Sequence, residues 1–351
     1  MVRPMQSHSC TVTGLALLGD ELRPETVSIT VEKGIIRSIE PAAGASDVWI
    51  IPAFFNAHTH CGDTVAMDCP CTGSLTELVT PPNGLKHRIL AETPRDRLVA
   101  AMRASIETMQ RSGTAGFADF REGGSDGVAA LREAAAGLAC RPLIFGRDGG
   151  EKIGDGLGIS SVRDVKDAER QVARARAEGK LVAFHAGERD PHDVNAALAF
   201  DPDLLVHCTH ATEKQLRECA DRDIPIAICA RSNWILGVAE RPAHPPVQRM
   251  LALGCRVYLG TDNVMFVHPD IFGEMAFISS VYRVPPEEIL RAAVAGSRLS
   301  GQTYFLQEGK SANFTVINAR DANIRFTRDP IATVVRRLSP AAVEQNVLTM
   351  R

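Results

Sequence analysis

Short apolar runs alternate with amphipathic stretches through the middle of the chain. Each run ends abruptly in polar residues, as expected of a strand buried on both faces, and the stretches between the runs have helical spacing. Thr93 and Pro94 form a helix-start signal, and Gly179 forms a helix stop. The pattern predicts strands near residues 50–55, 114–120, 142–145, 157–159, 181–184, 204–206, 224–228 and 256–259.

Eight strand–helix units within about 250 residues have the size of a (β/α)8 barrel. The alternative is a doubly wound open sheet. It is disfavoured because no glycine-rich phosphate-binding sequence follows the first strand, and because polar residues follow so many of the strands. We therefore predict an α/β protein with a TIM-type barrel over residues 52–302.

The two ends of the chain have a different pattern. Residues 26–31 alternate between apolar and polar, residues 32–34 form a turn, and residues 35–39 read as the second strand of a hairpin. A similar run occurs at residues 312–317. We predict a small β-sandwich domain built from residues 1–51 and 303–351, with the barrel inserted between its two parts.

Composition narrows the class of protein. The chain has 351 residues, 45% hydrophobic and 23% charged, with a net charge of -3 and mixed signs throughout. This composition is typical of a globular protein and gives no basic surface for nucleic acid or anionic membrane. No signal-peptide core or long apolar segment is present, and nine scattered cysteines suggest reduced thiols. We expect a cytoplasmic protein that binds a small molecule; a homo-oligomer is compatible with the sequence.

Histidine and aspartate residues stand at the carboxyl ends of four predicted strands. His58 and His60 end the first strand, and their i, i+2 spacing turns both to the same side, with Thr59 pointing away. Each residue alone has an ordinary explanation, as a core histidine or a turn-forming aspartate. A barrel, however, brings these ends to one mouth, which favours a shared Zn²⁺ or Fe²⁺ site. The other residues are His185, His207 and Asp262.

These strand ends belong to five longer motifs, which are the segments 52–60 (PAFFNAHTH), 185–188 (HAGE), 207–208 (HC), 229–233 (CARSN) and 260–263 (GTDN). Together these motifs resemble those of the amidohydrolase superfamily. The similarity is greatest to the branch with adenosine, cytosine and guanine deaminases and chlorohydrolase-like proteins, and it covers essentially the whole chain.

The resemblance implies a role for each of these residues. His58, His60, His185 and Asp262 would bind the metal, with Zn²⁺ as the first expectation and Fe²⁺ or Mn²⁺ as alternatives. His207, or His210 in its place, would position the water, and Asp262 would also act as base. Glu188 would protonate a ring nitrogen.

The resemblance also bears on the number of metal ions. Binuclear members carry a bridging lysine at the end of the fourth strand, whereas residues 155–161 contain none and Lys152 precedes them in an expected loop. We therefore expect one metal ion.

The activity expected from these residues is hydrolytic deamination of an aromatic N-heterocycle such as a purine, pyrimidine, pterin or triazine. The alternatives are hydrolysis of a cyclic amide, a formamide or an aryl chloride, and an inactive barrel that serves as a binding module. The small zinc deaminases are excluded because their H-x-E and P-C-x-x-C sequences are absent. Candidate substrate contacts, each equally compatible with an ion pair at the barrel rim, are Arg121, Arg147, Arg231 and Asn233.

Overall fold

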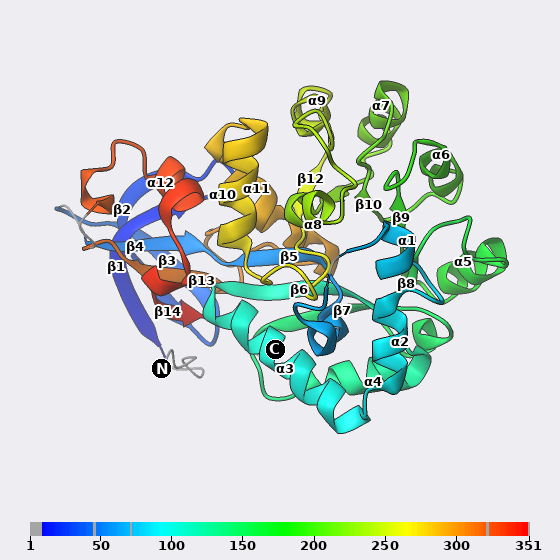
Figure 1. Ribbon diagram of the computed structural model, residues 1–351. Coiled ribbons are helices and arrows are strands. Elements are labelled where there is room, and N and C mark those ends of the chain that lie inside the picture. The colour runs from blue at the N-terminus through cyan, green and yellow to red at the C-terminus, as the bar shows by residue number, and fades with distance from the viewer. Residues whose placement is uncertain (1–8, 45–46, 71, 321–322, 350–351) are drawn as a thin grey trace.

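The computed structural model describes residues 9–44, 47–70, 72–320 and 323–349, which form two sheets and their covering helices (Figure 1). The larger sheet has eight strands, each hydrogen-bonded in parallel to the next along the chain. They are β5 (Phe54–Thr59), β6 (Thr114–Arg121), β7 (Arg141–Gly146), β8 (Gly156–Ile159), β9 (Leu181–Ala186), β10 (Leu204–His207), β11 (Ile226–Ile228) and β12 (Val257–Leu259).

The first and last strands of this sheet meet and close it into a barrel. The backbone N–H groups of Thr261 and Asp262 donate to the His58 carbonyl over 3.0 and 2.9 Å. Gly260 permits this approach, because a Cβ atom there would lie 2.8 Å from the His58 Cβ. The predicted eight-stranded α/β barrel is thus confirmed.

Helices cover the outside of the barrel (Figure 1). Its interior is filled by side chains from the strands. Strands buried on both faces are expected of a parallel sheet covered in this way, and all residues of β5, β6 and β8 are buried. The helices around the outside of the barrel are α3 (Arg95–Arg111), α4 (Gly124–Ala135), α5 (Ala168–Ala177), α6 (His192–Leu198), α7 (Glu213–Asp221), α9 (Val247–Ala252), α10 (Ile271–Tyr282) and α11 (Pro286–Ala295).

The remaining helices lie at the barrel mouth and near the C-terminus. The segment between β5 and α3 carries the 3₁₀ helix η1 (Cys61–Ala66), α1 (Leu75–Leu78) and α2 (Leu85–Glu92). We call residues 61–92 the lid segment. The other short helices are η2 (Gly150–Lys152), α8 (Ala230–Ile235), η3 (Gly296–Ser300), η4 (Ile324–Phe326), α12 (Pro330–Arg337) and η5 (Pro340–Ala342).

The smaller sheet joins both chain ends, as predicted, in the order β14-β13-β4-β1-β2-β3. Only the β1–β4 pair is parallel. Its strands are β1 (Cys10–Leu18), β2 (Arg23–Glu32), β3 (Ile35–Pro41), β4 (Val48–Pro52), β13 (Phe314–Asn318) and β14 (Val343–Val347).

This terminal sheet curls around its own apolar core. Ile36 N donates to Lys310 O over 2.9 Å, and Ala312 N donates to Gly34 O over 2.8 Å, so the free edge of β3 meets the residues that precede β13. The enclosed residues include Ile29, Ile50 and Phe314. The prediction of a sandwich is therefore corrected. The six strands form one continuous curled sheet instead of two stacked sheets, because each strand from β14 to β3 is hydrogen-bonded to the next.

Two further features concern the part of the chain that the structure describes. No helix in the described residues combines the length and apolar character needed to cross a membrane. The described cysteines are all free thiols, and Cys71 lies outside the described residues.

Candidate metal centre and its pocket

β5 delivers two histidines to the centre of the barrel mouth. His58 and His60 are buried, with relative exposures of 0% and 3%. Thr59 lies between them and points away, as predicted: its hydroxyl donates to Ala118 O over 3.0 Å and lies 3.1 Å from Asp119 Oδ2. Because side chains alternate along a strand, His58 and His60 face the barrel mouth, and Thr59 between them contacts the neighbouring strand β6.

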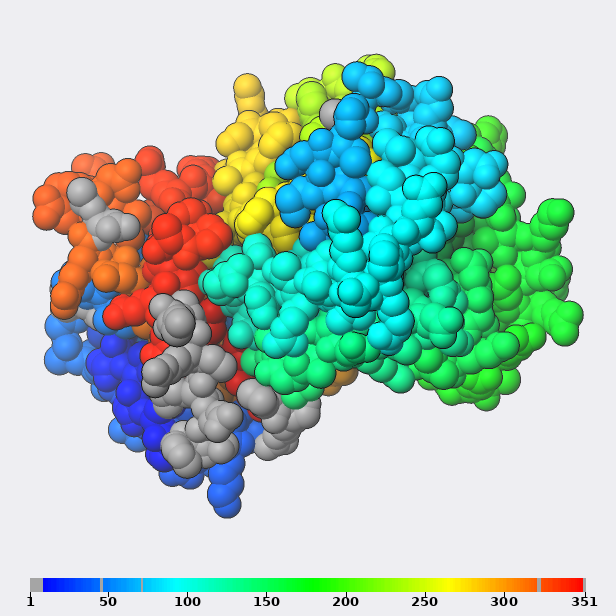
Figure 2. Space-filling model, turned by 60° about the horizontal axis from the view of Figure 1, so that its bottom comes forward, coloured from blue at the N-terminus to red at the C-terminus, as the bar shows by residue number. Residues whose placement is uncertain are grey.

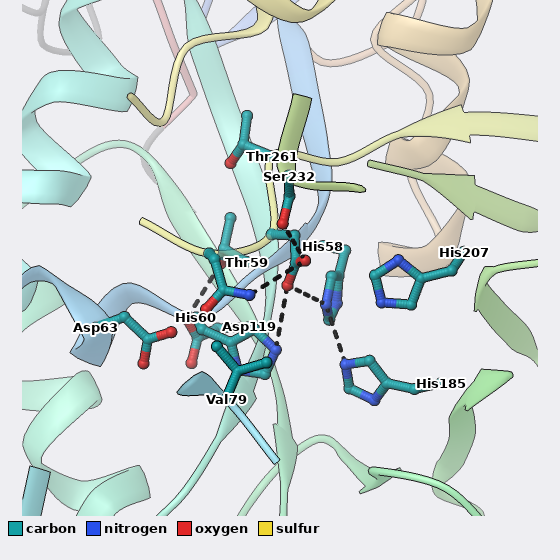
Figure 3. Close-up of polar contacts among 12 residues, drawn as sticks. His58, Thr59, His60, Asp63, Val79, Asp119, His185, His207, Ser232 and Thr261 are labelled. Atoms are coloured by element: carbon teal, nitrogen blue, oxygen red, sulfur yellow. Dashed lines mark hydrogen bonds and ion pairs between the residues drawn. The ribbon is translucent and has the colours of Figure 1, made fainter. Parts of the chain in front are cut away.

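Four of the predicted residues converge at this point, and we call them the His–Asp set: His58, His60, His185 and Asp262. Figure 3 shows the three histidines of this set close together. His58 Nε2 lies 3.2 Å from His185 Nε2 and 3.2 Å from Asp262 Oδ1. His60 Nε2 lies 3.5 Å from the same carboxylate oxygen. Strands β5 and β9 and the end of β12 therefore place nitrogen and oxygen atoms around one point.

The outer contacts of these rings show which atoms carry protons. His60 Nδ1 lies 2.9 Å from Glu122 Oε1, and His185 Nδ1 lies 3.1 Å from Ile159 O. A carboxylate and a carbonyl only accept, so each Nδ1 is the donor and each Nε2 presents a lone pair inward. Lone pairs facing a carboxylate need a cation between them, and three imidazoles with one carboxylate suit a divalent transition metal. The residues present thus fit the metal expected from the sequence.

The electrostatics favour the deprotonated forms that a metal requires. Burial lowers the pKa of His58 and of His185, and burial together with the charge of Lys86 lowers the pKa of His60 to about 3. Burial alone would raise the pKa of Asp262, but the contact with His58, 3.2 Å away, holds that pKa well below the ordinary value. The set therefore consists of neutral imidazoles and one carboxylate.

The backbone at the mouth is held in an unusual conformation. His207, Cys208 and Asp262 have φ angles of 75°, 47° and 59°, in the left-handed region that side chains rarely adopt. Ser232 Oγ donates to Asp262 Oδ2 over 2.6 Å and fixes the carboxylate. Such strain persists only where the surrounding structure imposes it, and it concentrates at functional sites.

Glu188 and His207 lie next to the His–Asp set. His207 Nε2 is 3.9 Å from Glu188 Oε1, and the His207 ring stands 5.5 Å from the His185 ring between centroids. Burial raises the pKa of Glu188 against the opposing effect of His207, and the charge of Asp262 adds to the rise. His210 instead packs against His244 at 5.0 Å and lines a separate groove. Of the two candidate histidines, His207 faces the set.

A pocket opens above these groups, with the lid segment forming part of its wall. The lid residues Val79, Thr80, Pro81 and Lys86 line it opposite the barrel residues. In the space-filling view the light-blue lid residues lie on the surface over the barrel (Figure 2). The barrel residues of the lining are His60, Arg147, Ser160, Ser161, Asp164, His185, Glu188, Arg189, Asp193, His207, Asp262 and Asn263.

A buried group of charges, which we call the Glu122 cluster, supports this wall. Glu122 Oε1 accepts from His60 Nδ1, from Lys86 Nζ at 3.0 Å and from Arg147 at 3.2 Å. Its other oxygen lies 2.5 Å from Arg121. Asp63, which pairs with Lys86 at 2.9 Å, and Asp119, which lies 3.4 Å from Arg121, complete the cluster. The cluster holds His60 in its tautomer and connects it to the lid segment.

The predicted substrate contacts have different surroundings. Arg147 lines the pocket, whereas the Arg121 guanidinium is buried against Gly62, where a Cβ atom would collide with it. Arg231 donates to Glu274 at 2.6 Å and to two backbone carbonyls of the β12–α10 connection. Asn233 is fully buried and donates to Thr209. Arg121, Arg231 and Asn233 thus lie outside the pocket lining, because nearer protein groups bind their side chains.

Sequence reasoning overlooked Lys86. It lies on α2, where a lysine in an amphipathic helix ordinarily faces solvent, yet its relative exposure is 2%. No local sequence signal reveals this burial, because the partner carboxylates come from η1 and from the end of β6.

Comparison with known proteins agrees with this site. The amidohydrolase family model matches residues 49–187, and the adenosine deaminase model matches residues 155–308. A putative aminohydrolase from Methanothermobacter thermautotrophicus is 32% identical over an alignment of 368 residues, gaps included, that covers 92% of this chain and 93% of that protein. The chain belongs to the amidohydrolase family. It is therefore a hydrolase that acts on carbon–nitrogen bonds other than peptide bonds.

A more distant relative and a solved structure of similar fold extend this comparison. A 5-methylthioadenosine/S-adenosylhomocysteine deaminase from Moorella thermoacetica is 25% identical over 348 residues, covering 83% of this chain and 78% of that protein. The zinc complex of atrazine chlorohydrolase from Arthrobacter aurescens shares the fold, with a TM-score of 0.80, 17% identity and coverage of 97% and 94% of the two chains. One amidohydrolase architecture thus serves both a deaminase and a chlorohydrolase.

Proposed function

We propose that this amidohydrolase removes ammonia from an aromatic N-heterocycle by hydrolysis, with one divalent metal ion, Zn²⁺ first, held by the His–Asp set. The observation that carries the proposal is Glu188, a carboxyl of raised pKa that lines the pocket beside His207 and the set. Two carboxyl groups with opposite pKa shifts are suited to opposite proton transfers. The adenosine deaminase match and the deaminase relative support this activity.

The chain's own residues would divide the reaction among them. When bound, the ion supplies the Lewis acidity that makes water nucleophilic at neutral pH. Asp262, kept ionised, accepts a proton from the attacking water as its oxygen bonds to the ring carbon. Glu188, whose pKa is raised, donates a proton to the adjacent ring nitrogen. The proton held by Asp262 then passes to the amino group, so that the carbon–nitrogen bond breaks and ammonia leaves, and the proton of the new hydroxyl group returns to Glu188 as the oxo product forms. His207 holds the water beside that carbon.

A single ion agrees with the residues at the fourth strand. β8 has the sequence Gly-Leu-Gly-Ile and offers no lysine, and Lys152 is exposed on η2. Metal analysis of the purified protein after supplementation with Zn, Fe or Mn should give about one equivalent. A content below about one tenth of an equivalent would favour an inactive barrel.

The activity is tested with a panel of amino-substituted purines, pyrimidines, pterins and triazines. We expect ammonia to be released in proportion to the oxo product. If instead only chloride, formate or a ring-opened acid is released from cyclic amides, formamides and aryl chlorides added to the panel, the deaminase proposal is wrong.

A further inference from the structure

Two buried cations face the same pocket as the His–Asp set. Lys86 comes from the lid segment and Arg147 from the residue after β7, and their side chains are 3% and 8% exposed. The Arg147 backbone continues the β6–β7 ladder, with its N–H donating to Arg121 O over 3.1 Å. The two side chains therefore reach the pocket from the lid and from the barrel.

Neither cation uses all its donors on the protein. Lys86 Nζ contacts Asp63 Oδ2 and Glu122 Oε1, which leaves one ammonium N–H. Among the described residues, one guanidinium nitrogen of Arg147 meets an acceptor, at Glu122 Oε1. Both residues line the pocket, so their remaining donors are open to an acceptor that a ligand supplies.

The charge of the surroundings restricts what that ligand group can be. Lys86, Arg121 and Arg147 each already lie against carboxyl groups of the Glu122 cluster, which are those of Asp63, Glu122 and Asp119. With the cations already neutralised, the wall has little surplus attraction for a carboxylate or a phosphate. A neutral carbonyl oxygen fits better, because its two lone pairs accept from both side chains without adding charge.

The free donors of Lys86 and Arg147 lie close to the His–Asp set, where the reaction would take place. Glu122 Oε1 accepts from both cations and also lies 2.9 Å from His60 Nδ1, on the far side of the ring whose Nε2 faces Asp262. The donors thus lie beside the His–Asp set, at the wall of the pocket where the edge of a bound ring would lie.

We propose that Lys86 and Arg147 bind a carbonyl oxygen of the substrate, so that the enzyme takes amino heterocycles that also carry an oxo group. The assignment of the reaction rests on the proposed function, whereas the recognition of the oxygen can be measured without turnover.

The test compares heterocycles that differ by that oxygen alone: cytosine with 4-aminopyrimidine, isoguanine with adenine, and guanine with 2-aminopurine. For the pair that is turned over, we expect kcat/KM to be about 100-fold higher for the oxo member, because its absence leaves buried donors unpaired. Equal kcat/KM within a pair, or preference for the member without oxygen, overturns the inference.

Variants assign the preference to the two side chains. Arg147→Met and Lys86→Met should each reduce it to about tenfold or less while metal content stays at the wild-type value. Arg141→Met, the same change at the exposed start of β7, should leave the preference intact. Lys86→Met can fail to fold, because it leaves Asp63 and Glu122 without a cation, so Arg147→Met is decisive. A preference that survives in Arg147→Met with bound metal overturns the inference.

Binding separates this inference from the proposed reaction. Calorimetry on the Glu188→Gln variant should show tighter binding of the oxo member in at least one pair, and Arg147→Met should remove the difference. This result supports the inference even if no compound releases ammonia, an outcome that overturns the proposed function alone. Equal binding within every pair, or no binding of any member, overturns the inference.

Discussion

The barrel mouth and the terminal sheet use their buried positions in opposite ways. The sheet encloses apolar side chains such as Ile29, Ile36 and Phe314, which are fully buried. The mouth buries the His–Asp set and the Glu122 cluster, with Arg121 at 1% exposure. Burial of apolar groups stabilises a fold, whereas buried charges are often no better for stability than apolar residues of the same size. The mouth is therefore arranged for chemistry and the sheet for stability.

The residues with strained backbone also have different roles in the two regions. In the terminal sheet, the non-glycine residues with positive φ are Leu22 and Lys33, which lie in the turns between strands. At the mouth they include His207 and Asp262, which carry chemical groups. Backbone strain in a turn reverses the chain, while at the mouth it directs a side chain toward the pocket.

Among the variants that test this difference between the two regions, His58→Ala should have the largest effect on metal binding and turnover. His58 Nε2 stands between His185 and Asp262, so its removal should take away metal binding and lower turnover roughly a thousandfold or more. Metal content and ammonia release measure the two losses. A variant that keeps one equivalent of tightly bound metal would show that His58 does not belong to the site.

Glu188→Gln should separate catalysis from metal binding. The amide keeps the size of the carboxyl but supplies no acidic proton, so turnover should fall by about 10²–10⁴-fold with metal content unchanged. Near wild-type turnover would remove Glu188 from the role of acid. Glu213→Gln on the outer helix α7, half exposed and paired with arginines, is the matched control and should leave turnover unchanged.

The pH dependence of turnover should show a smaller effect of Glu188. The acid form of Glu188 is required, and its raised pKa extends that form above the ordinary range of a carboxyl group. Turnover should therefore fall about tenfold per pH unit once the pH rises above that raised pKa. The lowered pKa of Asp262 keeps it ionised across the same range. A kcat/KM profile that is flat from about pH 5 to about pH 9 would contradict the assignment.

The sequence allowed much of the barrel to be predicted, because each buried parallel strand is an apolar run that ends in polar residues. It also indicated the His–Asp set, since barrel closure brings strand ends together whatever the intervening loops contain. It did not reveal which way Arg121, Arg231 or Asn233 turn, because their partners come from distant elements. Lys86 was missed for the same reason: its burial depends on how α2 packs against η1 and the end of β6.

The Arg231→Met variant tests whether Arg231, which follows strand β11, lies outside the pocket and stabilises the fold. Glu274 is fully buried, and the variant would leave its carboxylate without the 2.6 Å partner. Breaking such a pair should lower the free energy of unfolding by about 3 kcal/mol, with kcat/KM of the folded enzyme within about threefold of wild type. Urea denaturation and steady-state kinetics measure the two quantities. A large rise in KM with unchanged stability would instead make Arg231 a substrate contact.

Ile29→Ala should have the smallest effect on the site, although it weakens the fold. Ile29 is fully buried in the terminal sheet, where it pairs with Val12 and Ile39 on the neighbouring strands. Loss of its side chain should lower the free energy of unfolding by about 2–5 kcal/mol, measured by urea denaturation. Metal content and kcat/KM of the folded protein should stay at wild-type values, because the cavity lies in a core separate from the barrel. A fall in metal affinity that accompanies the loss of stability would show that the curled sheet supports the His–Asp set through β4 and β5, and that the division between the two regions is incomplete.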